Sequence, residues 1–160
     1  RTESKIDETV RMVREAGGTA QAFAADAAVE ANVVEMVRRC EAEFGSVNIF
    51  FANAFSWGGI ASIFDLTVQT WEEVLRVNLI GSFLAVKHAG LHMRDKGGGS
   101  IIFTSSVASL RSNAGDAAYS ASKAGINNLA ALAAHDFVGP LASLRGRPDA
   151  MQHCSAPGPN

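Results

Sequence analysis

The chain has few cysteines and few charged residues. Among its 160 residues only Cys40 and Cys154 are cysteines, 19% are charged, and the formal net charge is −2. The cysteines lie too far apart to form a metal-binding or redox pair, so we expect two reduced thiols in a cytoplasmic protein. There is also no basic cluster, which argues against a nucleic-acid partner.

Long hydrophobic runs, a visible signal peptide and internal repeats are also absent. The apolar runs are much shorter than the roughly 20 residues that span a bilayer, so no membrane partner is expected. Because the sequence begins with Arg1 rather than Met, the lack of a leader says nothing about the whole protein. With 48% hydrophobic residues and no low-complexity linker, residues 1–160 are predicted to belong to one globular domain, with no second domain.

Helical and strand-like segments alternate along the chain. Apolar spacing predicts four helices, at Glu3–Ala16, Val29–Phe44, Trp71–Arg94 and Ala117–Ala134. Short apolar segments predict three strands, at Thr19–Ala25, Val47–Phe51 and Ile101–Thr104, of which the second is expected to be buried on both faces. Residues 70–73 match a capping box at the start of the third helix. The alternation predicts an α/β fold with a doubly wound parallel sheet.

One stretch combines residue types that can perform acid–base chemistry. Tyr119 and Lys123 are four positions apart and therefore share one face of the predicted helix. An ammonium beside a phenol favours the phenolate and lowers the pKa of the tyrosine. Ser106 follows a predicted strand thirteen positions before Tyr119, where its hydroxyl could reach the same point. The alternative is a surface Tyr and Lys on an ordinary amphipathic helix.

With the surrounding T-S-S and A-A-Y-S-A-S-K-A sequences, these residues resemble the active site of the short-chain dehydrogenase/reductase family. The resemblance implies a Rossmann-like fold and hydride transfer between a secondary alcohol or ketone and NAD or NADP. It implies that Tyr119 exchanges a proton with the substrate oxygen and that Ser106 hydrogen-bonds this oxygen. Lys123 would lower the pKa of Tyr119 and hold the nicotinamide ribose.

Asn78, in the sequence V-N-L-I-G-S-F, matches a helical Asn of the family. There the Asn holds a water that links the active-site lysine to solvent. A polar side chain inside an apolar helical run destabilises the fold unless it is hydrogen-bonded. The alternative interpretation is an Asn that bonds back to its own bent helix.

Three pairs of residues match cofactor-binding positions of the family. Asp26 and Ala27 follow the first predicted strand, where Asp26 would bind the adenine edge or, alternatively, cap the next helix. Asn53 and Ala54 match a segment that passes beside the adenosine, although Phe55 stands where the family has Gly. Pro157 and Gly158 resemble a turn that passes the nicotinamide.

The glycine-rich phosphate loop of dinucleotide-binding folds is not found in these residues. The resemblance therefore identifies residues 1–160 as part of one dinucleotide-binding domain, with an incomplete doubly wound sheet. Because the strands that would lie between Thr19–Ala25 and Val47–Phe51 are absent, we expect that the chain alone does not form this sheet stably.

His88 and His92 have a spacing that can bind zinc, but no third ligand is evident, so no metal site is predicted.

The implied function is an NAD(P)-dependent oxidoreductase acting on a small alcohol or ketone. A 3-oxoacyl-thioester reductase of the same family is the alternative. In another class, the chain would be an incomplete piece that acts as an interaction module. By resemblance, the helices Trp71–Arg94 and Ala117–Ala134 would pair subunits into a homodimer or homotetramer.

Overall fold

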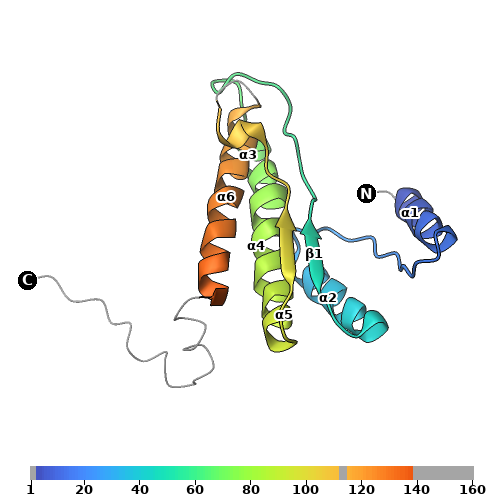
Figure 1. Cartoon of the computed structure of the whole chain (residues 1–160). Coiled ribbons are helices and arrows are strands. Elements are labelled where there is room, and N and C mark those ends of the chain that lie inside the picture. The colour runs from blue at the N-terminus through green and yellow to red at the C-terminus, as the bar shows by residue number, and fades with distance from the viewer. Residues whose placement is uncertain (1–2, 112–114, 139–160) are drawn as a thin grey trace, which may run out of the picture.

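The structure, a computed structural model, describes residues 3–111 and 115–138 as helices packed against a small parallel sheet (Figure 1). In chain order, its elements are α1 (Glu3–Glu15), α2 (Glu30–Phe44), β1 (Ile49–Ala52), α3 (Val68–Leu75), η1 (Arg76–Ile80), α4 (Gly81–Ala85), η2 (Val86–Gly90), α5 (Leu91–Asp95), β2 (Ser100–Phe103), η3 (Val107–Ser109) and α6 (Ala117–Val138). The five segments from α3 to α5 form one continuous helix, here called helix 68–95, which contains two π-helical turns, η1 and η2.

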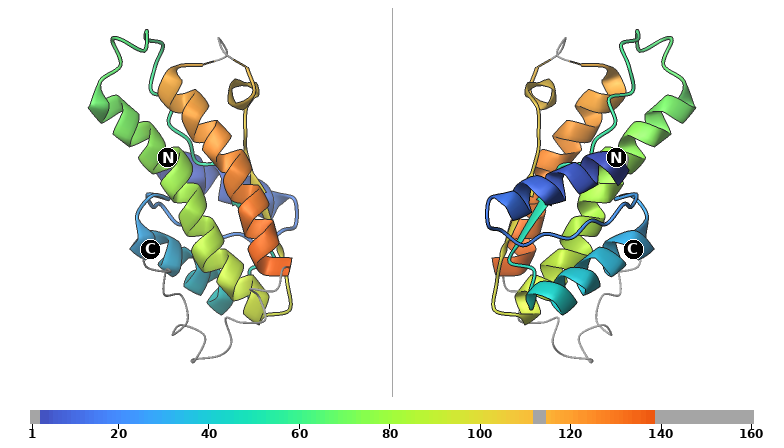
Figure 2. Two further views of the ribbon diagram at one scale, coloured as in Figure 1. Left: turned by 90° about the vertical axis from the view of Figure 1, so that its left-hand side faces the viewer. Right: turned by 90° about the vertical axis from the view of Figure 1, so that its right-hand side faces the viewer.

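The two strands pair in parallel, with Ile49 opposite Ser100 and Ala52 opposite Phe103. Helix 68–95 makes the crossover between them, and α6 runs beside this helix in all views (Figures 1 and 2). A parallel pair needs such a crossover, because a tight turn can only join antiparallel strands. The α/β class with a parallel sheet is therefore confirmed, with a sheet of two strands.

Two strand predictions were wrong. Residues 19–25 form no strand, because no other described segment pairs with them and a strand is held by its neighbour's hydrogen bonds. The strand predicted at Val47–Phe51 begins at Ile49 and is covered on one face only. Phe50 packs against the core, whereas Ile49 and Phe51 are exposed. Helices cover one side of the sheet, and α1 lies apart on the other side (Figure 1).

The covered face of the sheet packs on α2 and helix 68–95. A core cluster joins these elements through Val37, Val47, Ala89 and Met93, against which Phe50 and Ile101 pack. The cluster fixes the strands relative to the crossover helix. The carboxyl ends of both strands therefore lie beside the first half of helix 68–95 and the start of α6 (Figure 1).

Helix 68–95 starts earlier than predicted. Its N-cap is Thr67, whose hydroxyl accepts a hydrogen bond from the Thr70 amide at 3.1 Å. The capping box predicted at residues 70–73 is therefore wrong. Glu73 pairs instead with Arg76 at 2.8 Å, one turn along the helix. The third predicted helix thus begins at Val68, and the fourth extends to Val138 rather than Ala134.

By length and composition, helix 68–95 is apolar enough to cross a membrane. In this structure 44% of its most apolar window is buried inside the protein. It contacts the sheet on one side and α6 on another, so its position as the crossover helix already explains its apolar character.

The two histidines of helix 68–95 interact with different partners. His92 Nε2 accepts a hydrogen bond from the buried Val47 amide at 3.1 Å. His88 Nε2 lies 2.8 Å from Glu30 Oε1. No group of three His, Cys, Asp or Glu side chains in residues 3–111 and 115–138 could hold a metal. Cys40 is a free thiol whose pKa is raised by burial, and Cys154 lies outside the described residues.

Replacing His92 with Phe should lower the free energy of unfolding by about 1–3 kcal/mol, because it leaves the buried Val47 amide without its acceptor. Urea denaturation of the full-length protein measures the change. The control is His135→Phe, at an exposed position of α6, where we expect a change below about 0.5 kcal/mol. Equal stability of His92→Phe and the wild type would contradict the role given to this bond.

Candidate active site

The start of α6 brings Tyr119 and Lys123 together, both of them buried. Lys123 Nζ donates a hydrogen bond to the carbonyl oxygen of Thr104, which directly follows β2, at 2.7 Å. The same nitrogen lies 5.5 Å from the centre of the Tyr119 ring. Burial lowers the pKa of the Lys123 ammonium, since the side chain is only 3% exposed. The amine is therefore fixed beside the tyrosine with two N–H donors left over.

Asp116 directly precedes α6, and sequence reasoning missed its role. Its Oδ1 accepts a hydrogen bond from the Tyr119 amide at 2.7 Å, as an N-cap residue does. An Asp three positions before a helical residue is a recognisable capping signal, so the sequence contained this information. Its other oxygen, Oδ2, is buried and has no hydrogen-bond partner among the described residues. The cap fixes the first turn of α6 and thereby the backbone of Tyr119.

Ser106 lies at the end of the loop after β2, where it starts η3. Its hydroxyl accepts a hydrogen bond from the Ala108 amide at 3.2 Å. Ala108 packs in one apolar cluster with Tyr119, Val74 and Ala118. The structure therefore places the turn that begins at Ser106 against the same part of α6 as Tyr119.

Asn78 is 0% exposed and lies in the π-helical turn η1. Its Oδ1 accepts from the Ser56 amide at 2.7 Å, and its Nδ2 donates to the Ser56 carbonyl at 3.0 Å and to Ser122 Oγ at 2.9 Å. The side chain does not bond back to its own helix, so that alternative is wrong. Asn78 instead joins helix 68–95, the loop after β1 and α6. Both amide donors and the amide oxygen of Asn78 therefore bond within the protein.

The loop after β1 contributes two aromatic side chains to the site. The Trp57 and Tyr119 rings lie 4.6 Å apart between centroids and are tilted by 52°. The centre of the Phe55 ring, at the position where the family has Gly, lies 5.9 Å from Lys123 Nζ. Asn53 Oδ1 accepts from Thr104 Oγ1 at 2.6 Å and so ties this loop to the end of β2. Sequence reasoning missed Trp57, because no local pattern indicates which ring meets Tyr119.

Asp26 does not cap α2, so that alternative is wrong. The N-cap of α2 is Val29, and no side chain caps this helix. Asp26 Oδ1 accepts from the Ala28 amide at 2.8 Å, and Oδ2 pairs with Arg76 at 2.8 Å. The Ala28 amide and the Arg76 guanidinium hold the pKa of Asp26 below its usual value. Ala27 lies in this turn, whereas Pro157 and Gly158 fall outside the described residues.

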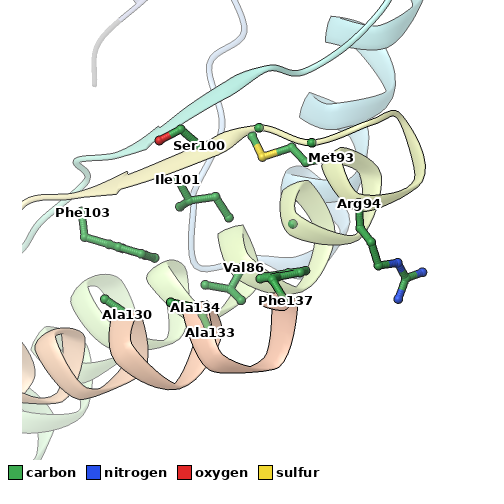
Figure 3. Close-up of a pocket in the computed structure, with 13 residues that line it drawn as sticks. Val86, Met93, Arg94, Ser100, Ile101, Phe103, Ala130, Ala133, Ala134 and Phe137 are labelled. Atoms are coloured by element: carbon green, nitrogen blue, oxygen red, sulfur yellow. The ribbon is translucent and has the colours of Figure 1, made fainter. Parts of the chain in front are cut away.

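An apolar pocket of about 410 Å³ lies away from these residues, between β2, α5 and α6 (Figure 3). Met93, Ile101, Phe103 and Phe137 are among its lining residues. No predicted site residue within residues 3–111 and 115–138 lines it, and its described wall offers little acid–base chemistry. The chemistry of the chain is therefore concentrated at the carboxyl ends of the strands, around Tyr119.

Residues 1–139 match the short chain dehydrogenase family model. The chain is 37% identical over 128 residues to the cis-4-hydroxycyclohexanecarboxylate dehydrogenase of Sinomonas cyclohexanicum, an alignment covering 80% of this chain and 51% of the relative. The chain spans about half the length of the relatives that it matches.

Solved structures show the same fold. The NAD⁺-bound xylitol dehydrogenase superposes with a TM-score of 0.81 at 29% identity, over 85% of this chain and 52% of that one. A 3-ketoacyl-ACP reductase from Sinorhizobium meliloti 1021 gives a TM-score of 0.76 at 33% identity, over 85% of this chain and 53% of that one. Family model, sequence relatives and fold agree, and this chain therefore belongs to the short-chain dehydrogenase/reductase family.

Proposed function

We propose that the protein is an NAD- or NADP-dependent oxidoreductase that interconverts a secondary alcohol and a ketone, with Tyr119 as the acid–base. The observation that carries this proposal is the buried Lys123 amine, held by the Thr104 carbonyl 5.5 Å from the centre of the Tyr119 ring. A cation in this position favours the phenolate, which can accept the proton of an alcohol.

The residues at the nicotinamide end of the site fit such a cofactor. After bonding to Thr104, Lys123 keeps two N–H donors that would hold the hydroxyls of the ribose. Asn53 and Ala54 would line its path, and Asp26 and Ala27 would meet the adenosine end, with Pro157 and Gly158 beside the nicotinamide. When bound, the cofactor supplies the hydride acceptor.

The remaining steps belong to the protein. Ser106 would hold the substrate oxygen while Tyr119 takes the hydroxyl proton, so that the C–H bond can break as hydride and leave a ketone. Asn78 would support the water relay that returns the proton to solvent, because it fixes helix 68–95, the loop after β1 and α6 relative to one another. The reverse reaction uses the same groups, with Tyr119 giving its proton to the carbonyl oxygen.

Spectrophotometric assays with NAD and NADP test the proposal directly. The full-length protein should reduce one or both cofactors in the presence of a panel of secondary alcohols. It should also oxidise the reduced form with the matching ketones. Failure with every alcohol and ketone, in a folded preparation that binds cofactor, would refute it.

A second candidate within the family is a 3-oxoacyl-thioester reductase, favoured by the fold similarity to the 3-ketoacyl-ACP reductase.

We also propose that the protein forms a homodimer or homotetramer through helix 68–95 and α6. Ile80, Phe83 and Leu132 on these helices are exposed apolar side chains, which a partner subunit would bury. If the chain were only an interaction module, it would bind no cofactor.

A further inference from the structure

Trp57 is held in place on both sides. The amide and carbonyl of Ser56 both bond to the buried side chain of Asn78. On the other side, Gly58 has φ of +81°, and a Cβ at this residue would lie 2.7 Å from Val74 Cγ2 and 2.8 Å from Asp116 Oδ2. Only glycine fits there without strain. The indole is therefore fixed against the Tyr119 ring, and 41% of the residue remains exposed.

The loop that carries Trp57 is apolar, and two charged groups beside it, Asp116 and Lys123, are buried. Residues 53–64 contain no Asp, Glu, Lys or Arg. Exposed apolar side chains continue along this loop and along the loop after β2, which lies at the same end of the helices (Figure 1): Phe55, Ile60, Ile63, Phe64, Val107 and Leu110. A substrate that approaches Tyr119 from this side meets hydrocarbon surface.

Polar side chains on the same loop already have partners. Asn53 accepts from Thr104, and the Ser62 hydroxyl accepts from the Phe64 amide. A linear polyol would place additional hydroxyls against this surface and lose their hydrogen bonds to water. A thioester carried on a charged phosphopantetheine arm would find no cation within residues 53–64. A compact hydrocarbon ring makes no hydrogen bonds to water and carries no charge, so it can pack against the same surface without losing a polar partner.

On the basis of the proposed function, we infer that Trp57 is a specificity-determining wall of the substrate site and that the substrate is an uncharged secondary alcohol carried on, or next to, a saturated ring. The exposed part of the indole packs against this ring, and the contact with Tyr119 aligns the carbinol with the acid–base. A saturated ring packs well against an indole, because both surfaces are apolar and the indole offers a large, flat contact area.

The test compares cyclohexanol with xylitol in the full-length protein. The wild type should have the higher kcat/KM for cyclohexanol. Trp57→Ala should lower this value about 10–100-fold and change the value for xylitol less than about threefold. Trp57→Phe, which keeps an aromatic wall, should restore most of the loss. Phe44→Ala removes a 46% exposed ring at the end of α2, outside this loop, and should leave both values unchanged.

Two results would overturn the inference. A wild type that prefers xylitol would exclude the substrate class. Equal losses for both substrates in Trp57→Ala would mean that Trp57 only positions Tyr119. A binding measurement separates these failures from failure of the proposed function. In a variant whose other tryptophans, Trp71 among them, are replaced by Phe, Trp57 fluorescence should be quenched saturably by cyclohexanone even if no alcohol is oxidised. Unchanged fluorescence would contradict the contact between the substrate ring and Trp57.

Discussion

Replacing Tyr119 with Phe in the full-length protein should lower kcat at least about 10³-fold while cofactor binding stays within about threefold. The substitution removes one hydroxyl and keeps the ring that packs against Trp57 and the buried cluster around Val74. The fold and the amine of Lys123 therefore remain in place. The substitution removes the group that accepts the substrate proton, so it slows the chemical step and lowers kcat.

Steady-state kinetics and cofactor titration measure the two quantities separately. Ser120→Ala is the matched control, since it removes a hydroxyl from the next position of α6, and its kcat should stay within about twofold. A Tyr119→Phe variant with substantial turnover would contradict the role of Tyr119. Loss of cofactor binding together with turnover would show instead that the hydroxyl supports the structure of the site.

The helices were predictable from sequence because their signals are local. Apolar spacing located all four helical regions, and the errors are confined to their ends, as at Thr67 and Val138. The strands depended on neighbours that no local pattern reveals. Residues 19–25 have strand-like composition but no partner strand in the described part of the chain. Phe51 is as apolar as Phe50, and only the arrangement of helices on one face decides which of them is buried.

The same distinction holds for the candidate site. Tyr119 and Lys123 were found because they lie one helical turn apart. Their surroundings combine segments distant in sequence. The Thr104 carbonyl that holds Lys123 is a backbone group, which composition cannot indicate. Asn78 was identified by its match to the helical Asn of the family, but its bonds to Ser56 required the folded chain.

The isolated 160-residue chain should unfold without a single cooperative thermal transition and should give a weak near-UV circular dichroism signal. A sheet of two strands is marginal on its own, and three or more strands with a covered face are usually needed. Here the face opposite helix 68–95 exposes Ile49, Phe51 and Ile102. Residues 18–26 have no paired strand among the described residues, and α1 stands apart from the core (Figure 1).

The comparison that decides this is thermal unfolding of the 160-residue chain beside the full-length protein, followed in the near-UV. Helical signal in the far-UV should persist in the short chain, because helix 68–95 and α6 pack mainly on each other and on a short sheet. Binding of a hydrophobic dye should be stronger for the short chain, since its bare sheet face is apolar. One sharp transition with a strong near-UV signal would contradict the expectation. It would mean that the clusters around Val37 and Val74 suffice to fix the active-site residues.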